Sequence, residues 1–297
     1  MTSNPFSLSI KILLYVVICS RNIESLSTKS TVDTSKIRAI SLDVTGTLLA
    51  TKEPVVKSYR DAAIWARLPT VPTKDDFKKG FGVAFRKRCI ESPCFGGVEG
   101  ISGREWWFQT VQRVLDEALE EERGYTEEDF ERYFRRVYQH FGSPAGYMIL
   151  DDANSFLTSI SSSSLILGIT SNTPTRHMES VLPMLNIHDK FNWFTCSQSV
   201  GAEKPSPQIF DDAFRQAKFW LPDLEKDSIL HIGDSYTNDY CGAKAYGFQA
   251  LLLDRSDNPA VTQYQDWLEA PDYPGKSGDD LEANTITNLE EVASLLL

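Results

Sequence analysis

Residues 37–47 of the chain read IRAISLDVTGT, and this stretch decides the fold. Its first six residues form a short β-rich run that ends at Asp43, where a turn containing Gly46 begins. Apolar strands that alternate with helices predict an α/β fold, in which a parallel sheet is covered by helices on both faces. Further β-rich runs lie at 165–170, 193–196, 229–232 and 249–253, with helical periodicity between them at 175–185, 205–218 and 238–246.

A long interval, residues 54–150, breaks this alternation, because it shows helical periodicity and no convincing strand. Thr126 precedes three acidic residues and then an apolar stripe, which is the pattern of a helix with an N-cap and an acidic first turn. Residues 103–119 have the same periodicity, and 74–90 predict a third helix that two glycines interrupt. We therefore expect a helical insertion after the first strand. The last residues, 285–297, predict a short strand and a closing helix.

The N-terminal segment contains an eight-residue apolar run, ILLYVVIC at 12–19. A helix that spans a membrane needs about 20 such residues, so we expect no stable membrane insertion. The run fits the apolar part of a cleaved targeting segment, and it also fits an extension without a fold. We expect a soluble intracellular protein of the cytoplasm, the nucleus or an organelle. The predicted division is an N-terminal extension or targeting segment at 1–35, a core domain at 36–53 and 151–297, and a helical cap domain at 54–150.

Composition narrows the function classes. Hydrophobic residues make up 41% of the 297 residues and charged residues 24%, which excludes a disordered or collagen-like chain. Against 41 Asp and Glu stand 30 Lys and Arg, so the net charge is −11 and we expect no nucleic-acid partner. The five cysteines and four histidines lack the spacing of a zinc site. A serine–histidine triad is not expected, because the chain has no Gly-x-Ser-x-Gly motif.

Candidate site residues follow from the predicted sheet, because ligands of open parallel sheets bind outside the carboxyl ends of the strands. Alone, each residue at a strand end is ordinary turn or capping chemistry. As an ordered set, these residues predict one site where acids, a hydroxyl group and an ammonium group meet. The set comprises Asp43 and Thr47 after the first strand, Ser171 and Asn172 after the second, Lys204 after the third, and Asp234 and Asp239 after the fourth.

Asp43 is the candidate nucleophile, because a carboxylate can attack phosphorus or carbon and split one displacement into two easier steps. Attack on a phosphate dianion by an anion requires cations. Asp43 and Asp234 supply hard oxygen ligands for Mg²⁺, and Lys204 supplies a second positive charge. Asp239 would complete the metal site from further out, by orienting Lys204 or a bound water.

A small anionic substrate fits this chemistry. Ser171 and the backbone N–H groups of the loop that ends at Thr47 would bind phosphoryl oxygens, with Asn172 beside them. In the helical insertion, Arg86 and Arg104 are cations that could hold a second anionic group of the substrate. For either arginine taken alone, a solvated helix face is the simpler explanation.

Together, these motifs resemble the four sequence motifs of the haloacid dehalogenase (HAD) superfamily, in order and over about residues 37–297. The resemblance implies a Rossmann-like three-layer core with a parallel sheet, an inserted helical cap of type C1, an aspartyl nucleophile and Mg²⁺ as cofactor. DVTGTLL at 43–49, Trp106-Trp107 and GDSYTNDY at 233–240 resemble one branch of the superfamily. That branch contains haloacid dehalogenase-like hydrolase domain-containing protein 3 and the rhythmically expressed gene 2 product.

Thr45 departs from the pattern of the phosphatases in this superfamily, which have Asp-x-Asp in the first motif. The second Asp of that motif protonates the leaving oxygen and later activates water. A threonine hydroxyl cannot act as such an acid or base near neutral pH. Loss of a general acid or base typically costs about 10²–10⁴ in rate. Thr45 would still shape the loop and offer its backbone carbonyl to Mg²⁺.

Three kinds of relative lack this acid, so three alternatives to an ordinary phosphatase stay open. A 2-haloacid dehalogenase needs no acid, because halide leaves without a proton. A phosphonoacetaldehyde hydrolase forms a Schiff base with a cap lysine, for which Lys78, Lys79 and Lys87 are available. The third is a weak or inactive protein that binds a ligand. Asp234, which the dehalogenases lack, favours a metal-dependent hydrolase acting on phosphate monoesters. The oligomeric state is left open.

Overall fold

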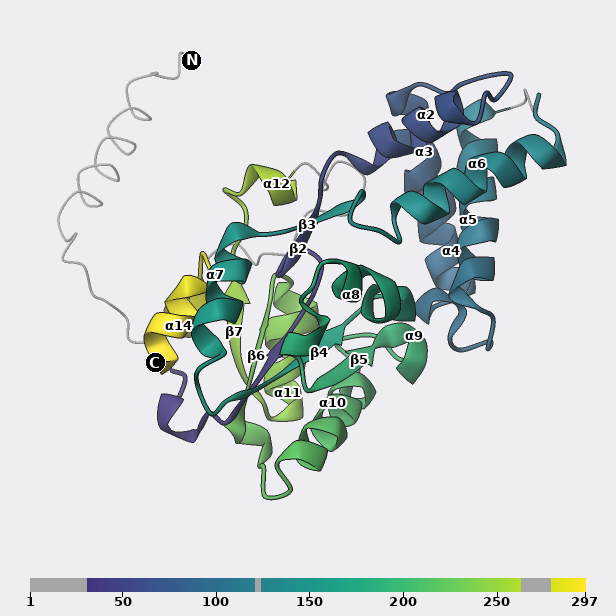
Figure 1. Cartoon of the computed structure of the whole chain (residues 1–297). Coiled ribbons are helices and arrows are strands. Elements are labelled where there is room, and N and C mark those ends of the chain that lie inside the picture. Colours follow the sequence, from purple (N-terminus) through teal and green to yellow (C-terminus); the bar gives the residue numbers. More distant parts are fainter. Residues whose placement is uncertain (1–30, 121–123, 263–278) are drawn as a thin grey trace, which may run out of the picture.

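The computed structural model describes residues 31–120, 124–262 and 279–297 (Figure 1). The apolar run at 12–19, and most of the predicted extension or targeting segment 1–35, lie outside the described residues. Within the described ranges, no helix is both long enough and apolar enough to cross a bilayer.

In the described part of the chain, six strands form a parallel sheet in the order β5-β4-β1-β6-β7-β8. Strand β1 is central and pairs with β4 on one side and β6 on the other, so that Leu42 is opposite both Ile169 and Ile232. The five β-rich runs and the short C-terminal strand are thereby confirmed. The strands are β1 (Ala39–Leu42), β4 (Ile166–Ser171), β5 (Trp193–Cys196), β6 (Ile229–Gly233), β7 (Gln249–Leu253) and β8 (Thr285–Ile286).

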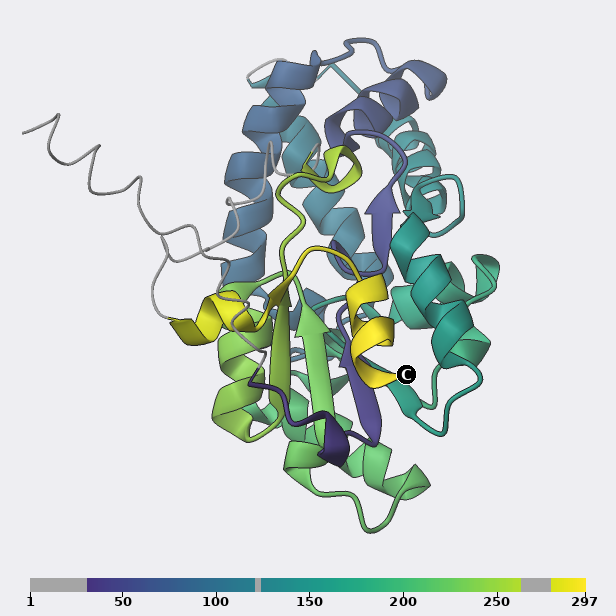
Figure 2. The same ribbon diagram turned by 90° about the vertical axis from the view of Figure 1, so that its left-hand side faces the viewer.

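Helices cover both faces of the sheet, which gives the predicted three-layer α/β core (Figures 1 and 2). Side chains point alternately to the two faces of a strand, so Ala39 packs with Phe210 on one face while Ile40 packs with Phe156 on the other. The first face is covered by α10 (Pro207–Trp220) and α11 (Gly242–Tyr246), and the second by α7 (Asp151–Ile160), α8 (Leu182–Met184) and α14 (Glu290–Leu296).

Two of the predicted helices contain a π-helical turn a few residues after a strand. The helix predicted at 175–185 consists of the π turn η5 (His177–Val181) and α8, and that at 238–246 consists of η8 (Tyr236–Cys241) and α11. Such turns are frequent at functional sites. Short elements connect the rest: η2 (Thr34–Lys36), η6 (His188–Lys190), α9 (Ser197–Val200), η7 (Lys226–Ser228), α12 (Pro259–Thr262) and α13 (Asp279–Ala283).

The helical insertion, by which we mean α2 to α6, packs beside the core (Figure 1). Helix α5 has the predicted bounds, and α6 begins with the predicted N-cap. Thr126 Oγ1 accepts a hydrogen bond from Asp129 N at 3.2 Å, and Asp129 Oδ2 accepts one from Thr126 N at 3.0 Å. Its helices are α2 (Val55–Trp65), α3 (Lys74–Gly80), the π turn η3 (Phe81–Phe85), α4 (Arg86–Glu91), η4 (Cys94–Gly96), α5 (Gly103–Leu119) and α6 (Glu127–His140).

One correction concerns strands. We expected no convincing strand within 54–150, but β3 (Tyr147–Ile149) lies there and pairs antiparallel with β2 (Leu49–Thr51). Thr51 is opposite Tyr147, and Leu49 is opposite Ile149. Each strand has three residues, which is too short for a recognisable alternation. This two-stranded ribbon joins the helical insertion to the core.

Candidate active site

Three neighbouring strands deliver the predicted carboxylates and hydroxyl to one edge of the sheet. Asp43 directly follows β1, Ser171 ends β4, and Asp234 directly follows β6. Asp43 also donates its backbone N–H to Ile232 O at 3.0 Å, which ties the start of the first loop to the neighbouring strand. The chain continues from β1 to β4 and β5 on one side of β1 and then crosses to β6 and β7 on the other side. This edge is therefore a topological switch point, where open α/β sheets bind ligands.

The turn after Asp43 is closed tightly around Gly46. Val44 O accepts hydrogen bonds from both Leu48 N and Leu49 N, at 2.8 and 2.9 Å. Gly46 has a φ of +85°, and a Cβ there would lie 2.3 Å from Asp234 Oδ2. Both the left-handed backbone and the contact with Asp234 require glycine.

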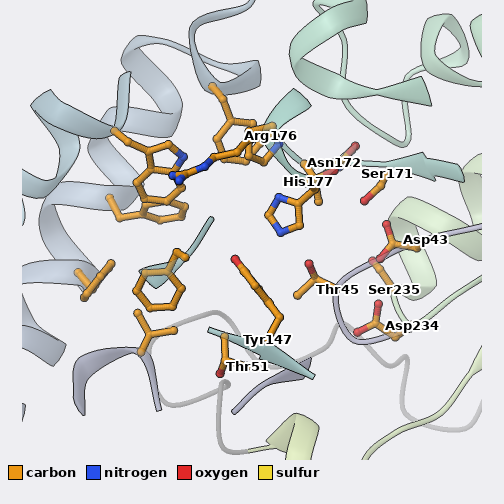
Figure 3. A pocket seen from close by; sticks show the side chains of 18 of the residues that line it. Asp43, Thr45, Thr51, Tyr147, Ser171, Asn172, Arg176, His177, Asp234 and Ser235 are labelled. Carbon is orange, nitrogen blue, oxygen red and sulfur yellow. The ribbon is translucent and has the colours of Figure 1, made fainter. Parts of the chain in front are cut away.

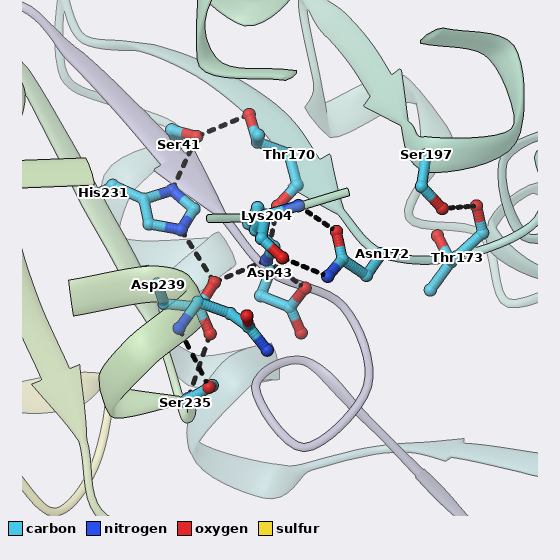
Figure 4. A network of polar contacts seen from close by, with 11 residues as sticks. Ser41, Asp43, Thr170, Asn172, Thr173, Ser197, Lys204, His231, Ser235 and Asp239 are labelled. Carbon is cyan, nitrogen blue, oxygen red and sulfur yellow. Dashed lines mark hydrogen bonds and ion pairs between the residues drawn. The ribbon is translucent and has the colours of Figure 1, made fainter. Parts of the chain in front are cut away.

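Lys204 is buried between two of the carboxylates (Figure 4). Its Nζ donates to Asp43 Oδ1 at 2.6 Å, to Thr170 O at 2.9 Å and to Asp239 Oδ1. Asn172 fixes the backbone of the same lysine, because its Oδ1 accepts from Lys204 N at 2.7 Å and its Nδ2 donates to Lys204 O at 3.0 Å. Asn172 was predicted to bind substrate; it lines the cavity described below, and its amide also positions Lys204.

Asp239 is the centre of a buried network. His231 Nε2 lies 2.9 Å from Asp239 Oδ1, and Ser235 N donates to Asp239 Oδ2 at 3.0 Å (Figure 4). On its other side, His231 Nδ1 lies 2.9 Å from the hydroxyl of Ser41. Both carboxylate oxygens of Asp239 therefore contact protein groups. These contacts fit the predicted role of orienting Lys204 and leave direct coordination of an ion to other residues.

The charges at this edge do not balance, because three carboxyl groups (Asp43, Asp234 and Asp239) surround the single ammonium group of Lys204. Burial raises the pKa of Asp234, and the charges of Asp43 and Asp239 raise it further. Burial also raises the pKa of Asp43 against the opposing charge of Lys204. Fully ionised, the four groups sum to −3 + 1 = −2, which one divalent cation would neutralise. The hard oxygens of Asp43 and Asp234 are the ligands that Mg²⁺ prefers, so the residues present fit that ion.

A cavity of about 460 Å³ opens above these residues. At one end, Figure 3 shows Asp43, Ser171, Asp234 and Ser235 close together. The helical insertion supplies the opposite wall, which is almost entirely apolar. Its aromatic members are Tyr59, Phe81, Phe85, Phe95, Trp107, Tyr138 and Phe141.

Most predicted site residues line this cavity: Asp43, Thr45, Ser171, Asn172, Lys204, Asp234 and Asp239. Thr47 does not. Its side chain is completely buried, its hydroxyl has no hydrogen-bond partner among the described residues, and its carbonyl accepts from Arg255 Nη2 at 2.9 Å. The loop geometry places Thr47 beneath the site instead of in contact with a ligand.

Arg86 and Arg104, the two predicted cations of the helical insertion, are also absent from the lining of the cavity. Arg86 is exposed on α4, and Arg104 is exposed on α5, where its guanidinium lies 5.3 Å from the centroid of the Phe134 ring. Helical periodicity alone could not decide toward which side of the insertion these residues point. The structure therefore does not place either arginine against a substrate in this cavity.

Several residues that line the cavity were not predicted. Arg176 and His177 follow Ser171 by five and six residues, in the loop that leaves the carboxyl end of β4. Their position after a strand was a signal that could have identified them. Tyr147 belongs to the unpredicted strand β3, and Trp107 lines the cavity while its neighbour Trp106 is buried.

Comparisons with known proteins agree with this architecture. The family model described as haloacid dehalogenase-like hydrolase matches residues 37–247. Haloacid dehalogenase-like hydrolase domain-containing protein 3 of Homo sapiens is 28% identical over 218 residues, covering 73% of this chain and 82% of that protein. The rhythmically expressed gene 2 protein of Drosophila melanogaster is 24% identical over 225 residues, covering 74% and 84%. These two relatives are the proteins given above for the branch that the sequence motifs resemble.

A solved structure with the same fold is the 2-haloacid dehalogenase from Pseudomonas syringae pv. Tomato DC3000. It is 20% identical, and the superposition covers 88% of this chain and 98% of that one with a TM-score of 0.58. At this identity the likeness concerns the fold.

Proposed function

Because the chain belongs to the haloacid dehalogenase-like hydrolase family, we propose that it hydrolyses phosphate monoesters of small anionic metabolites with Mg²⁺ as its cofactor. The observation that carries the proposal is the group of Asp43, Asp234, Asp239 and Lys204 at the acidic end of the cavity, which has two negative charges in excess when fully ionised. Asp43 and Asp234, with the backbone carbonyl of Thr45, would hold the ion, which would neutralise charge on the phosphoryl oxygens.

The protein's own residues would divide the reaction into two displacements. A carboxylate oxygen of Asp43 forms a bond to phosphorus as the bond between phosphorus and the ester oxygen breaks, and the alcohol leaves. Water then attacks phosphorus of the aspartyl phosphate and releases inorganic phosphate. Lys204, held by Asp239, keeps a positive charge against Asp43 throughout.

Thr45 leaves the ester oxygen without a protein acid at this position. That oxygen must then take its proton from water, which slows the release of strongly basic alkoxides more than that of phenoxides. We therefore expect aryl phosphates to react faster than alkyl phosphates of similar size.

Dehalogenation of a 2-haloacid is the second candidate. The observation that favours it is that Thr45, and no acid, occupies this position in a cavity with an apolar wall. Halide needs no proton, so the missing acid would cost nothing. Against it stands Asp234, a carboxylate that attack on a neutral carbon does not require. The Schiff-base alternative loses support, because Lys78, Lys79 and Lys87 are all exposed and none lines the cavity.

The test is phosphate release from a panel of aryl and alkyl phosphates, with Mg²⁺ and with a chelator, for the wild type and for Asp43→Asn. We expect release that needs Mg²⁺ and falls at least about 10³-fold in Asp43→Asn, because the amide cannot replace the nucleophile. Asp223→Asn, a change in an exposed acid paired with Arg38, is the matched control and should keep wild-type rates.

Equal release by wild type and Asp43→Asn would refute the phosphatase proposal. Halide release from 2-haloacids that depends on Asp43 would then identify the second candidate. Absence of both activities would leave a protein that binds a ligand without turning it over.

A further inference from the structure

Arg176 is a cation that lines the cavity without a carboxylate partner among the described residues. Its Cζ atom lies 3.4 Å from the centroid of the Tyr138 ring on helix α6. It also fills the space beside Gly142, where a Cβ would come within 1.7 Å of Arg176 Nη2. Although Arg176 belongs to the core, its guanidinium is therefore held by the helical insertion.

The next residue, His177, is a second polar group without a partner. It is only 8% exposed, it lines the same cavity, and neither ring nitrogen has a hydrogen-bond partner in the described structure. The ring of Tyr147 contacts the imidazole edge to face, with centroids 5.2 Å apart. Buried polar groups are nearly always hydrogen-bonded, so two unpaired nitrogens on a side chain that lines a cavity indicate that a ligand supplies the partner.

Arg176 and His177 can both donate hydrogen bonds to the same kind of ligand atom. Burial, together with the charge of Arg176, lowers the pKa of His177 to about 4, so the imidazole is neutral at pH 7 and has one N–H to donate. The guanidinium adds several N–H donors in one plane. An oxyanion accepts from both, whereas a cation or an apolar group would leave these donors unsatisfied.

Stacking on Tyr138 could also give Arg176 a purely structural role as a bridge between core and insertion. That contact uses one face of the guanidinium and leaves the N–H groups at its edge unpaired. A largely buried cation without a counter-ion is costly, and a neutral side chain would fill the same space without that cost. The absence of a counter-ion for Arg176 among the described residues therefore indicates that an anion enters the cavity.

Figure 3 shows Arg176 away from the end of the cavity where Asp43 and Asp234 lie, with His177 between them. The aromatic wall of the insertion lines the same cavity. The volume of about 460 Å³ lies in the range of small-molecule sites and exceeds what a phosphoryl group alone would occupy.

We propose that Arg176 and His177 form an oxyanion subsite, which binds a second anionic group of the substrate while its phosphoryl group lies at Asp43. The substrate class is then a phosphate monoester whose ring-containing or apolar body carries a carboxylate or a second phosphate. This inference rests on the proposed function, since it names the substrate of the same site. It replaces Arg86 and Arg104 as the cations that select the substrate.

Turnover of three aryl phosphates tests the subsite in the intact protein with Mg²⁺. The probes are 4-carboxyphenyl phosphate, its neutral analogue 4-carbamoylphenyl phosphate, and 1,4-phenylene bisphosphate. We expect the wild type to prefer the carboxylate over the amide by roughly 10- to 100-fold in kcat/KM, mainly through KM, as a charge-assisted hydrogen bond allows. A preference for the bisphosphate over the carboxylate would support the subsite and identify a phosphoryl group as its ligand.

Four variants assign the preference to named residues. Arg176→Met, which keeps the length of the side chain, should reduce the preference to about threefold or less, because the carboxylate loses more kcat/KM than the amide. Arg176→Lys should retain part of it, and His177→Leu should lower it partly. Arg136→Met is the matched control, because Arg136 also stacks on an aromatic ring, that of Trp65 at 5.3 Å, but lies outside the cavity.

Binding is measured separately, so that failure of the subsite and failure of the phosphatase proposal can be told apart. Calorimetry with 4-carboxybenzylphosphonate and 4-carbamoylbenzylphosphonate needs no turnover. The subsite would be supported, even if no ester were hydrolysed, if the wild type bound the carboxylate ligand more tightly than the amide ligand and Arg176→Met removed this difference. Equal affinity of the wild type for both phosphonates, or equal losses for both ligands in Arg176→Met, would overturn it and leave Arg176 a structural bridge.

Discussion

Thr45 lies in the cavity near the candidate nucleophile, at the position where phosphatases of this superfamily have a second Asp. We predict that Thr45→Asp raises kcat for alkyl phosphates about 10- to 100-fold. The new carboxyl group can protonate a basic leaving oxygen, and such catalysis typically contributes about 10²–10⁴. Aryl phosphates should gain less, since phenoxides leave more readily. Steady-state phosphate release for the two ester classes measures the difference.

Thr45→Asn is the control for this gain, because the amide is similar in size to the carboxyl group of Asp but cannot act as an acid or a base near pH 7. It should leave both ester classes at or below the wild-type rate. An equal rise in Thr45→Asn and Thr45→Asp would show that space, and not proton transfer, limits the reaction.

His177 makes the stability of the fold depend on pH. Its pKa is about 4 in the folded protein, against an ordinary value of 6.5, because burial and Arg176 disfavour the charged ring. Between those two values the unfolded chain binds a proton that the folded protein does not, so the free energy of unfolding decreases as pH falls from about 6.5 to 4. The total loss is about 3 kcal/mol, and it is absent above pH 6.5.

Denaturant titrations at several pH values measure this effect. We predict that His177→Phe loses about 3 kcal/mol less stability than the wild type between pH 6.5 and 4, whatever its stability at pH 8. Parallel curves for the two proteins over that window would show that His177 does not titrate as a buried group.

At the scale of elements, the packing of α3 against α5 depends on one glycine. A Cβ on Gly80 would lie 2.5 Å from Val114 O, whereas a Cβ on Gly82 would meet nothing within 4 Å. We predict that Gly80→Ala destabilises the protein by about 1–3 kcal/mol, because the helices must separate. Thermal or denaturant unfolding gives the value.

Gly82→Ala is the matched control for that packing, because Gly82 lies two residues further along, in the π turn η3. It should be neutral or stabilise the protein by up to about 1 kcal/mol, since alanine restricts the unfolded chain and favours the helix. Equal destabilisation by both changes would mean that the turn itself needs glycine and that the contact with α5 is not the cause.

Strands and helices with strong local patterns could be predicted from the sequence. The runs at 193–196 and 249–253 are apolar and flanked by breaks, and they coincide with β5 and β7. Strands β2 and β3 could not be predicted, because three residues show no alternation and their pairing joins segments about 100 residues apart. The π turns also escaped prediction, because a single π turn adds only one residue to the helical repeat and leaves the apolar pattern of the whole helix nearly unchanged.

The acidic end of the site was predictable for a topological reason, and the other end was not. Asp43, Ser171 and Asp234 each stand at the end of a strand, so the order of strands brings them together. Arg176 and Arg104 are both cations near helix starts. Whether such a side chain faces the cavity or solvent depends on how the insertion packs on the core, which no local pattern determines.

At the scale of the whole molecule, one hydrophobic core extends from the sheet into the helical insertion. The same cluster contains Leu42 of β1, Phe156 of α7, Tyr147 of β3 and Phe134 of α6. The aromatic wall of the cavity is the edge of this cluster that the core leaves uncovered. The cavity is therefore formed by the association of both parts and would not exist on either one alone.

Mg²⁺ should stabilise the whole chain, because an ion that binds only the folded state shifts the unfolding equilibrium. At a Mg²⁺ concentration 100 times the Kd, the expected gain is about 2.7 kcal/mol in a denaturant titration, and a chelator should remove it. Asp234→Asn should lose most of this gain, since it removes one of the two carboxylates proposed to hold the ion.

Asp223→Asn again serves as the control, because it removes an exposed acid far from the cavity lining and should leave the gain intact. A full Mg²⁺ effect in Asp234→Asn would place the ion elsewhere on the protein.

The ribbon of β2 and β3 also bears on how such a chain can change over generations. Thr51 and Tyr147 are paired neighbours, so everything between them leaves and re-enters the core at one point. A segment with adjoining ends can be exchanged in one recombination event without stretching the remainder. Asp43 and Lys204 would stay behind, while most of the aromatic wall would depart with the exchanged piece. The acidic end of the cavity and most of its aromatic wall are thus inherited on separate stretches of the gene, and selection can revise the second while preserving the first.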